Sequence, residues 1–161
     1  MLYDENKFRT LTTMKIIQTI QRVFGKKVSK QFLTAIDLFN KRLFWEAHEV
    51  FEDVWRLQEG DVKKLVQGFV QAAAAFSYIE KRRYESILYL FDKSIEKLSS
   101  TLRLLPEVNV NDLIEAMKKA KQEAQRHGES ELEKFDSSLY PSIKIGQPAS
   151  RDRVRSRRLQ S

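Results

Sequence analysis

The sequence predicts an all-α protein, a single-domain bundle of about six helices with a short extended C-terminal segment. The chain has 161 residues but only five glycines and three prolines, and this scarcity of turn residues favours helices over strands joined by tight turns. Apolar residues recur at helical spacing along most of the chain. With 42% apolar and 32% charged residues, the composition is typical of a soluble globular domain.

Residues 1–28 are expected to form an N-terminal helix packed on the bundle, or else an arm. A modest apolar stripe precedes Gly25, which is typical of a helix end. Ser29 is expected to cap a second helix, which closes at Asn40, because asparagine tolerates the left-handed conformation of a helix end. The first stripe consists of Ile16, Ile17, Ile20, Val23 and Phe24.

The helical pattern continues through the middle of the chain. A third helix is predicted from about residue 43 to 58, with its apolar face formed by Phe44, Ala47, Phe51 and Val54. A fourth helix, from about 61 to 83, contains the alanine run 72–75. Small residues let neighbouring helices approach closely, so the fourth helix is expected to be central.

The C-terminal part contains two more helices and a polar tail. A fifth helix is expected from about 84 to 105, and a sixth from Asn109 or Asn111 to Gly128. Residues 140–145 look extended and are expected to dock across the bundle. The predicted organisation is therefore an N-terminal helix or arm (1–28), a helical bundle domain (29–146) and a disordered, Arg-rich tail (147–161).

Charge and composition exclude several classes of function. The net charge is 29 − 22 = +7, of which residues 151–161 supply 5 − 1 = +4, so the basic pI is interpreted as largely a property of the tail. The chain has no cysteine, which excludes disulfides, thiolate metal sites and a cysteine nucleophile. No apolar run is long enough for a membrane span, and no secretion signal is expected. The predicted location is cytoplasmic.

The third helix carries the main candidate for chemistry. At 100° per residue, His48 and Trp55 lie about 20° apart at one edge of the apolar arc, and Glu52 lies about 40° further towards solvent. His48 and Glu52 can therefore face the same neighbour, with Trp55 lining it. Glu46 and Glu49 lie farther round the helix.

Three interpretations of His48 compete. It can be a hydrogen-bonded structural histidine, as lone buried histidines usually are. The string from His48 to Glu52 also resembles part of the zinc-protease motif H-E-x-x-H, but the second histidine is absent and the only other one is His127. The third interpretation is a metal-free polar pocket for a small ligand, with His48 as acid or base.

The fourth helix contributes Gln67, Gly68 and Gln71 to an otherwise apolar segment. The two glutamines share a face because they are four residues apart. A glycine inside a helix costs roughly 1 kcal/mol relative to alanine, so Gly68 is expected to allow close contact with another helix, plausibly the third. The alternative is simple packing at Gly68, with both glutamines in water.

These residues resemble the signature of a prokaryotic and plastid family, domain of unknown function 309. The resemblance covers about 32–102 and rests on the following motifs: Leu38-Phe39-Asn40, Glu46-Ala47-His48-Glu49 with Trp55, and Gln67-Gly68-Phe69-Val70-Gln71. It implies an all-helical bundle but no established biochemical role. It also implies a location in the plastid stroma if the gene is plastid-encoded. The sequence departs from the family at Tyr78, where a histidine is usual, and at Arg82-Arg83, where Gly-Asn is usual; a metal site is therefore less favoured.

The preferred function is a ligand- or partner-binding module with a polar pocket between the third and fourth helices. His48 would carry the hydrogen bond or proton, Glu52 would orient it, and Trp55 would form an apolar wall. One alternative is a metal-assisted hydrolase that uses His48 and nearby carboxylates, so the sequence does not decide whether the protein is an enzyme. The predicted pocket residues are Glu46, His48, Glu49, Glu52, Trp55, Gln67 and Gln71.

A further alternative is an RNA-associated accessory protein that acts through its basic tail. Five arginines there are enough for salt-sensitive, non-specific binding. The competing interpretation is a solubilising tail. An apolar face left over on the first helix could also make a homodimer. No membrane partner is expected, and the only cofactor considered is a metal ion. The tail arginines are Arg151, Arg153, Arg155, Arg157 and Arg158.

Overall fold

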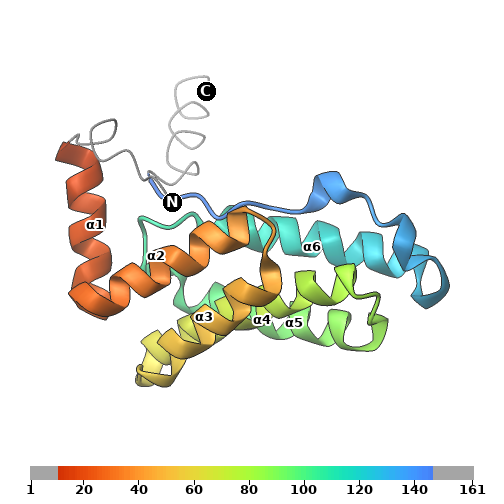
Figure 1. Ribbon diagram of the computed structural model, residues 1–161, viewed down its shortest axis with the longest axis horizontal. Helices are drawn as coiled ribbons and strands as arrows, with labels where there is room; N and C mark the ends of the chain where they lie inside the picture. Colours follow the sequence, from red (N-terminus) through yellow and green to blue (C-terminus); the bar gives the residue numbers. More distant parts are fainter. Residues whose placement is uncertain (1–10, 147–161) are drawn as a thin grey trace, which may run out of the picture.

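A computed structural model describes residues 11–146 and confirms the all-α fold (Figure 1). None of the helices in this part of the chain is long and apolar enough to cross a membrane. Three short 3-10 helices, 102–104, 129–134 and 137–139, accompany the α-helices. The α-helices are α1 (Leu11–Phe24), α2 (Lys26–Asn40), α3 (Phe44–Arg56), α4 (Gly60–Glu80), α5 (Tyr84–Thr101) and α6 (Val110–His127).

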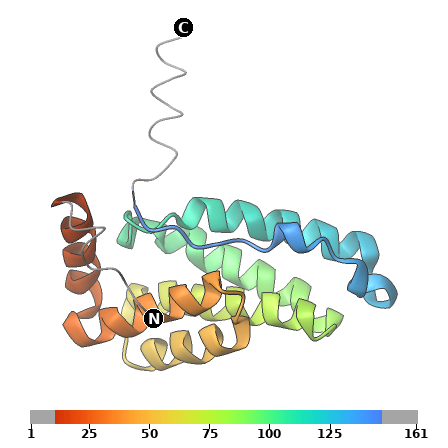
Figure 2. The same ribbon diagram turned by 45° about the horizontal axis from the view of Figure 1, so that its top comes forward.

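The core of the fold is a pair of antiparallel hairpins, α2–α3 and α4–α5 (Figure 1). Helix α4 packs against both α3 and α5, as its alanine run predicts. Helix α1 stands across the end of α2, and α6 packs on α5 (Figures 1 and 2).

The two hairpins end their first helices in the same way. The N–H of Leu43 donates to the Leu38 carbonyl over 3.0 Å, and the N–H of Arg83 donates to the Tyr78 carbonyl over 2.9 Å. These bonds are typical of a Schellman motif, which places one residue in the left-handed conformation. That residue is Arg42 in the first turn, with φ of 62°, and not Asn40 as the sequence suggested.

The second turn repeats the first at an offset of 40 residues, since Arg82 has φ of 57°. The offset also aligns buried positions of the two hairpins, such as Phe51 with Phe91 and Ala35 with Ala75. The structure therefore contains two copies of one helical hairpin.

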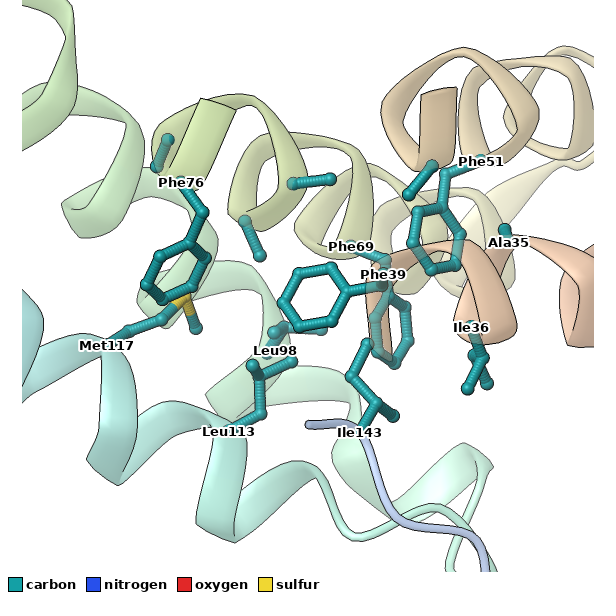
Figure 3. Close-up of a cluster of buried hydrophobic side chains, with 14 of the residues drawn as sticks. Ala35, Ile36, Phe39, Phe51, Phe69, Phe76, Leu98, Leu113, Met117 and Ile143 are labelled. Atoms are coloured by element: carbon teal, nitrogen blue, oxygen red, sulfur yellow. The ribbon is translucent and has the colours of Figure 1, made fainter. Parts of the chain in front are cut away.

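Phenylalanine rings fill the space between the hairpins (Figure 3). The Phe32 ring meets Phe69 with centroids 5.4 Å apart, and Phe39 meets Phe76 at 5.8 Å, both edge to face. Such geometry places the positive ring edge against the negative face of the neighbour. The core therefore fixes α2 and α4 relative to each other.

Of the predicted helix caps, the one on α6 is present in the structure and the one on α2 is not. Of the two predicted caps of α6, Asn109 and Asn111, the structure shows Asn109, because its Oδ1 accepts from the N–H of Asp112 over 3.1 Å. The prediction that Ser29 caps α2 is wrong. The helix begins at Lys26, and the buried Ser29 hydroxyl instead donates to the Lys26 carbonyl over 2.8 Å.

The segment after the last 3-10 helix runs back along α6 in an extended conformation (Figure 2). Asn40 holds it with two hydrogen bonds: its Nδ2 donates to the Ile143 carbonyl over 3.0 Å, and the N–H of Ile143 donates to its Oδ1 over 2.6 Å. Ile145 then forms an isolated antiparallel bridge with Val108. The docking expected for residues 140–145 is therefore present, with Ile143 buried.

Candidate ligand-binding groove

A groove of about 470 Å³ lies over α4, between α3 and α5. His48 from α3 and Gln71 from α4 both line it, so the structure brings these two predicted residues together. Aromatic and apolar side chains supply most of the remaining wall. The other lining residues are Val70, Ala74, Tyr78, Glu85, Ser86, Tyr89 and Leu90.

His48 occupies the α3 side of the groove and stacks on Trp45. Their rings lie 4.7 Å apart at an interplanar angle of 19°. The Lys81 ammonium lies 3.7 Å from the centre of the Trp45 ring, in cation–π geometry. Trp45 therefore holds His48 in place, and its position three residues before His48 on the helix could have predicted this contact.

Burial lowers the pKa of His48, and this effect outweighs the nearby Glu52 and Glu49 carboxylates, which raise it; Lys81 lowers it further. The imidazole is therefore neutral at pH 7. Its Nε2 lies 3.7 Å from the Glu52 carboxylate, which favours the tautomer with the proton on Nε2. In that tautomer Nδ1 is a hydrogen-bond acceptor.

Two buried polar atoms at this groove have no partner within the described residues. They are Nδ1 of His48 and Oε1 of Gln71. A buried acceptor left without a hydrogen bond costs about 1–3 kcal/mol. Both atoms are closed to solvent, so a donor from a ligand or from water reaches them only when neighbouring side chains move.

The other predicted pocket residues lie outside the groove lining. Trp55 packs under the Lys63 ammonium, 4.4 Å from its ring centre, and its buried Nε1 has no partner among the described residues. Glu52 pairs with Arg56 over 3.2 Å as well as facing His48. Gln67 is half-buried and Glu49 is exposed.

Glu46 lies close enough to Glu80, the last residue of α4, to affect its ionisation. Burial raises the pKa of the Glu80 carboxyl, with Arg42 lowering it and Glu46 raising it. These charges therefore lie together at the hairpin ends and not in the groove.

The packing at Gly68 corrects one expectation about α4. A Cβ at this position would lie 2.6 Å from Cδ2 of Leu98, so the glycine allows close approach of α5 and not of α3. The Ser94 hydroxyl also donates to the Gly68 carbonyl over 2.6 Å.

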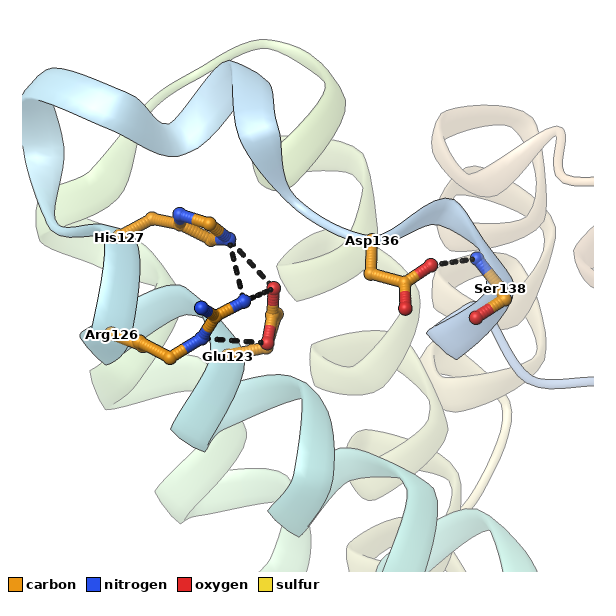
Figure 4. A network of polar contacts seen from close by, with 5 residues as sticks. All are labelled: Glu123, Arg126, His127, Asp136 and Ser138. Atoms are coloured by element: carbon orange, nitrogen blue, oxygen red, sulfur yellow. Dashed lines mark hydrogen bonds and ion pairs between the residues drawn. The ribbon is translucent and has the colours of Figure 1, made fainter.

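The second histidine lies in an ion-pair cluster at the end of α6 (Figure 4). His127 Nε2 is 2.6 Å from Oε1 of Glu123, and Arg126 Nη2 donates to the same oxygen over 2.8 Å. Hydrogen bonds from Arg126, and less strongly from His127, lower the pKa of Glu123. His127 does not line the groove.

The donor set does not fit the metal interpretation. Within residues 11–146, no three His, Asp or Glu side chains gather closely enough to hold an ion. The metal-assisted hydrolase therefore has no ligand set in the part of the chain that the structure describes.

Fold and groove together define an all-helical domain of two repeated hairpins with a groove along the central helix. The family model described as "Domain of unknown function (DUF309)" matches residues 32–90. This match confirms the resemblance seen in the sequence. The match includes every residue that lines the groove. No curated protein matches the chain.

Proposed function

We propose that the domain is a binding module whose groove accepts a small molecule or a partner side chain with a flat apolar body and one hydrogen-bond donor. The buried, unpartnered Nδ1 of neutral His48 is the observation that carries this proposal. A ligand N–H or O–H would reach this acceptor only by displacing the side chains that cover it, and the same holds for Gln71 Oε1, a second covered acceptor on a lining residue.

The walls support an apolar or aromatic body. Tyr89 is 61% exposed although it is aromatic, and it faces the groove together with Tyr78 and Leu90. Ligand sites are typically lined by aromatic and apolar side chains, with a few polar groups that fix orientation.

The repeat identifies a suitable test variant. At an offset of 40 residues His48 aligns with Leu88, which occupies the same place in the second hairpin. The hairpin therefore tolerates leucine there, and His48→Leu should remove the acceptor while keeping the fold. Gln125→Leu, at an exposed site on α6, is the matched control.

The experiment titrates the ¹⁵N-labelled protein with indole and with 1-methylindole, which has almost the same shape but no N–H donor. Indole should shift the amides of residues 70–78 and 85–90. A hydrogen bond to a buried acceptor is worth about 1–3 kcal/mol, so 1-methylindole should bind roughly 10- to 100-fold more weakly.

His48→Leu should bind both probes equally, whereas Gln125→Leu should discriminate as the wild type does. Equal binding of the two probes by the wild type, or shifts confined to other surfaces, would refute the proposal. Melting curves of both variants show whether a change in binding reflects loss of fold.

A further inference from the structure

The net positive charge of the folded part is concentrated in one segment, residues 11–36, which comprise α1 and most of α2. Residues 11–36 contain five Lys and Arg and no Asp or Glu, a net of +5. Residues 37–150 contain 17 basic and 19 acidic residues, a net of −2. The basic pI is therefore not mainly a tail property, which corrects the expectation from the sequence.

The charged side chains lie on the outer faces of these helices. On α1, Lys15, Gln18 and Arg22 are exposed, and their spacing of three and four residues places them on one face. On α2, Lys26, Lys27 and Lys30 are exposed on the face opposite the buried Phe32. We call these six side chains the α1–α2 basic face.

Two of these lysines are placed against the helix dipole. Lys26 and Lys27 open α2, and its first turn contains no acidic residue. Cations destabilise the positive N-terminal end of a helix. The first acidic residue on this helix, Asp37, pairs with Lys41 over 2.9 Å, one turn later. The cluster therefore does not serve the stability of α2.

We propose that the α1–α2 basic face is a contact surface for nucleic acid, which it binds through the phosphate backbone without regard to sequence. Clustered Lys and Arg with a neighbouring amide are the groups that contact phosphates. The face has no exposed aromatic ring between residues 14 and 30 on which a base could stack, so no base preference is expected.

The packing of these helices favours nucleic acid over a lipid surface. Their apolar residues Ile20, Phe24 and Phe32 are buried in the core. Met14 is 51% exposed, but a single side chain does not make an apolar face. An interfacial membrane helix needs a free apolar face to insert below the headgroups. The face lies outside the matched family segment 32–90, and the proposal is independent of the groove.

The test measures binding of the full chain to a 20-nucleotide oligouridine over a range of salt. The variant Lys26→Gln/Lys27→Gln/Lys30→Gln removes three cations from the face. The control Lys118→Gln/Lys119→Gln/Lys134→Gln removes three exposed cations from α6 and the segment after it. Both variants have the same net charge, so bulk charge cannot distinguish them.

For single strands, the logarithm of the binding constant falls with log salt at a slope of about −0.7 per phosphate contact. Three lost contacts should therefore make the slope less steep by about 2 and weaken binding roughly 100-fold at 0.1 M salt. The control should change binding less than about threefold. The triple variant should melt at the same or a higher temperature, because it removes cations from a helix N-terminus.

Equal effects of the two lysine variants on RNA binding, or no effect of either, would overturn the proposal. A third contradicting outcome is the loss of all binding when the five arginines at 151–158 are replaced by glutamine, because that result would assign binding to the tail. Those arginines lie outside the described residues. A parallel arm with anionic lipid vesicles adds a fourth: vesicle binding that depends on Lys26, Lys27 and Lys30 without RNA binding.

Discussion

Removing the Asn40 side chain should release the extended C-terminal segment from the bundle. Asn40 makes two hydrogen bonds with the backbone of Ile143, at 3.0 and 2.6 Å. Each such bond contributes about 1 kcal/mol net, and the Ile143 groups left behind are partly buried, so Asn40→Ala should cost about 2–3 kcal/mol. For a domain of this size that is a fall in Tm of about 4–12 °C.

Urea denaturation measures the global effect, and hydrogen exchange at the Ile143 amide measures the local one. Asn40→Asp keeps an acceptor for the Ile143 N–H but loses the donor to its carbonyl, so its loss should be intermediate. Asn111→Ala, at an exposed site at the start of α6, should stay within about 0.5 kcal/mol of the wild type.

If Asn40→Ala keeps both the urea midpoint and the protection of the Ile143 amide, the reasoning is wrong and water replaces the two hydrogen bonds. If only the amide protection falls, the segment detaches locally without unfolding the bundle. That result would separate its contribution from that of the hairpins.

Three other substitutions test the site and the packing. Burial lowers the pKa of His48, so on acidification the imidazole takes up its proton in the unfolded chain before it does so in the folded protein. Stability should therefore fall as the pH drops below about 6.5 and level off below the folded pKa. His48→Gln should remove this pH dependence in urea titrations. Gly68→Ala places a Cβ 2.6 Å from the buried Leu98. The overpacking costs about 1–3 kcal/mol, and the higher helix propensity of alanine returns about 1 kcal/mol. The free energy of unfolding should therefore fall by up to about 2 kcal/mol, which a lower urea midpoint would show. Arg82→Gly relieves the strain of a left-handed φ of 57°, whereas glycine adds entropy to the unfolded chain. The net effect should be a gain of up to about 1 kcal/mol in the free energy of unfolding, measured as a higher Tm.

The helices could be predicted because apolar periodicity directly reports the buried face of each one. The third helix, expected over 43–58, is Phe44–Arg56, and the fourth, expected over 61–83, is Gly60–Glu80. Periodicity does not report which neighbour covers that face. For this reason Gly68 was assigned to α3, although it packs against Leu98 of α5.

The groove could be predicted only in part, for a geometric reason. The angle between His48 and Trp55 on a helical wheel is small, but seven residues separate them by about 10 Å along the axis. Trp55 therefore meets Lys63 and not the groove. Tyr89 reaches the groove from α5, and no local pattern in the sequence places α5 beside His48.

The repeated hairpin separates what the fold requires from what the groove adds. Gln31 and Gln71 are equivalent at the 40-residue offset, and both bury an Oε1 without a partner among the described residues. A feature present in both hairpins is compatible with a structural origin, so Gln71 alone is weak support for binding. His48 has leucine at its equivalent position, and Tyr89 has Glu49. The hairpin can therefore be built without His48 and Tyr89, which supply the acceptor and part of the aromatic wall of the groove. For this reason, His48 is the position at which a binding role and a structural role predict different results.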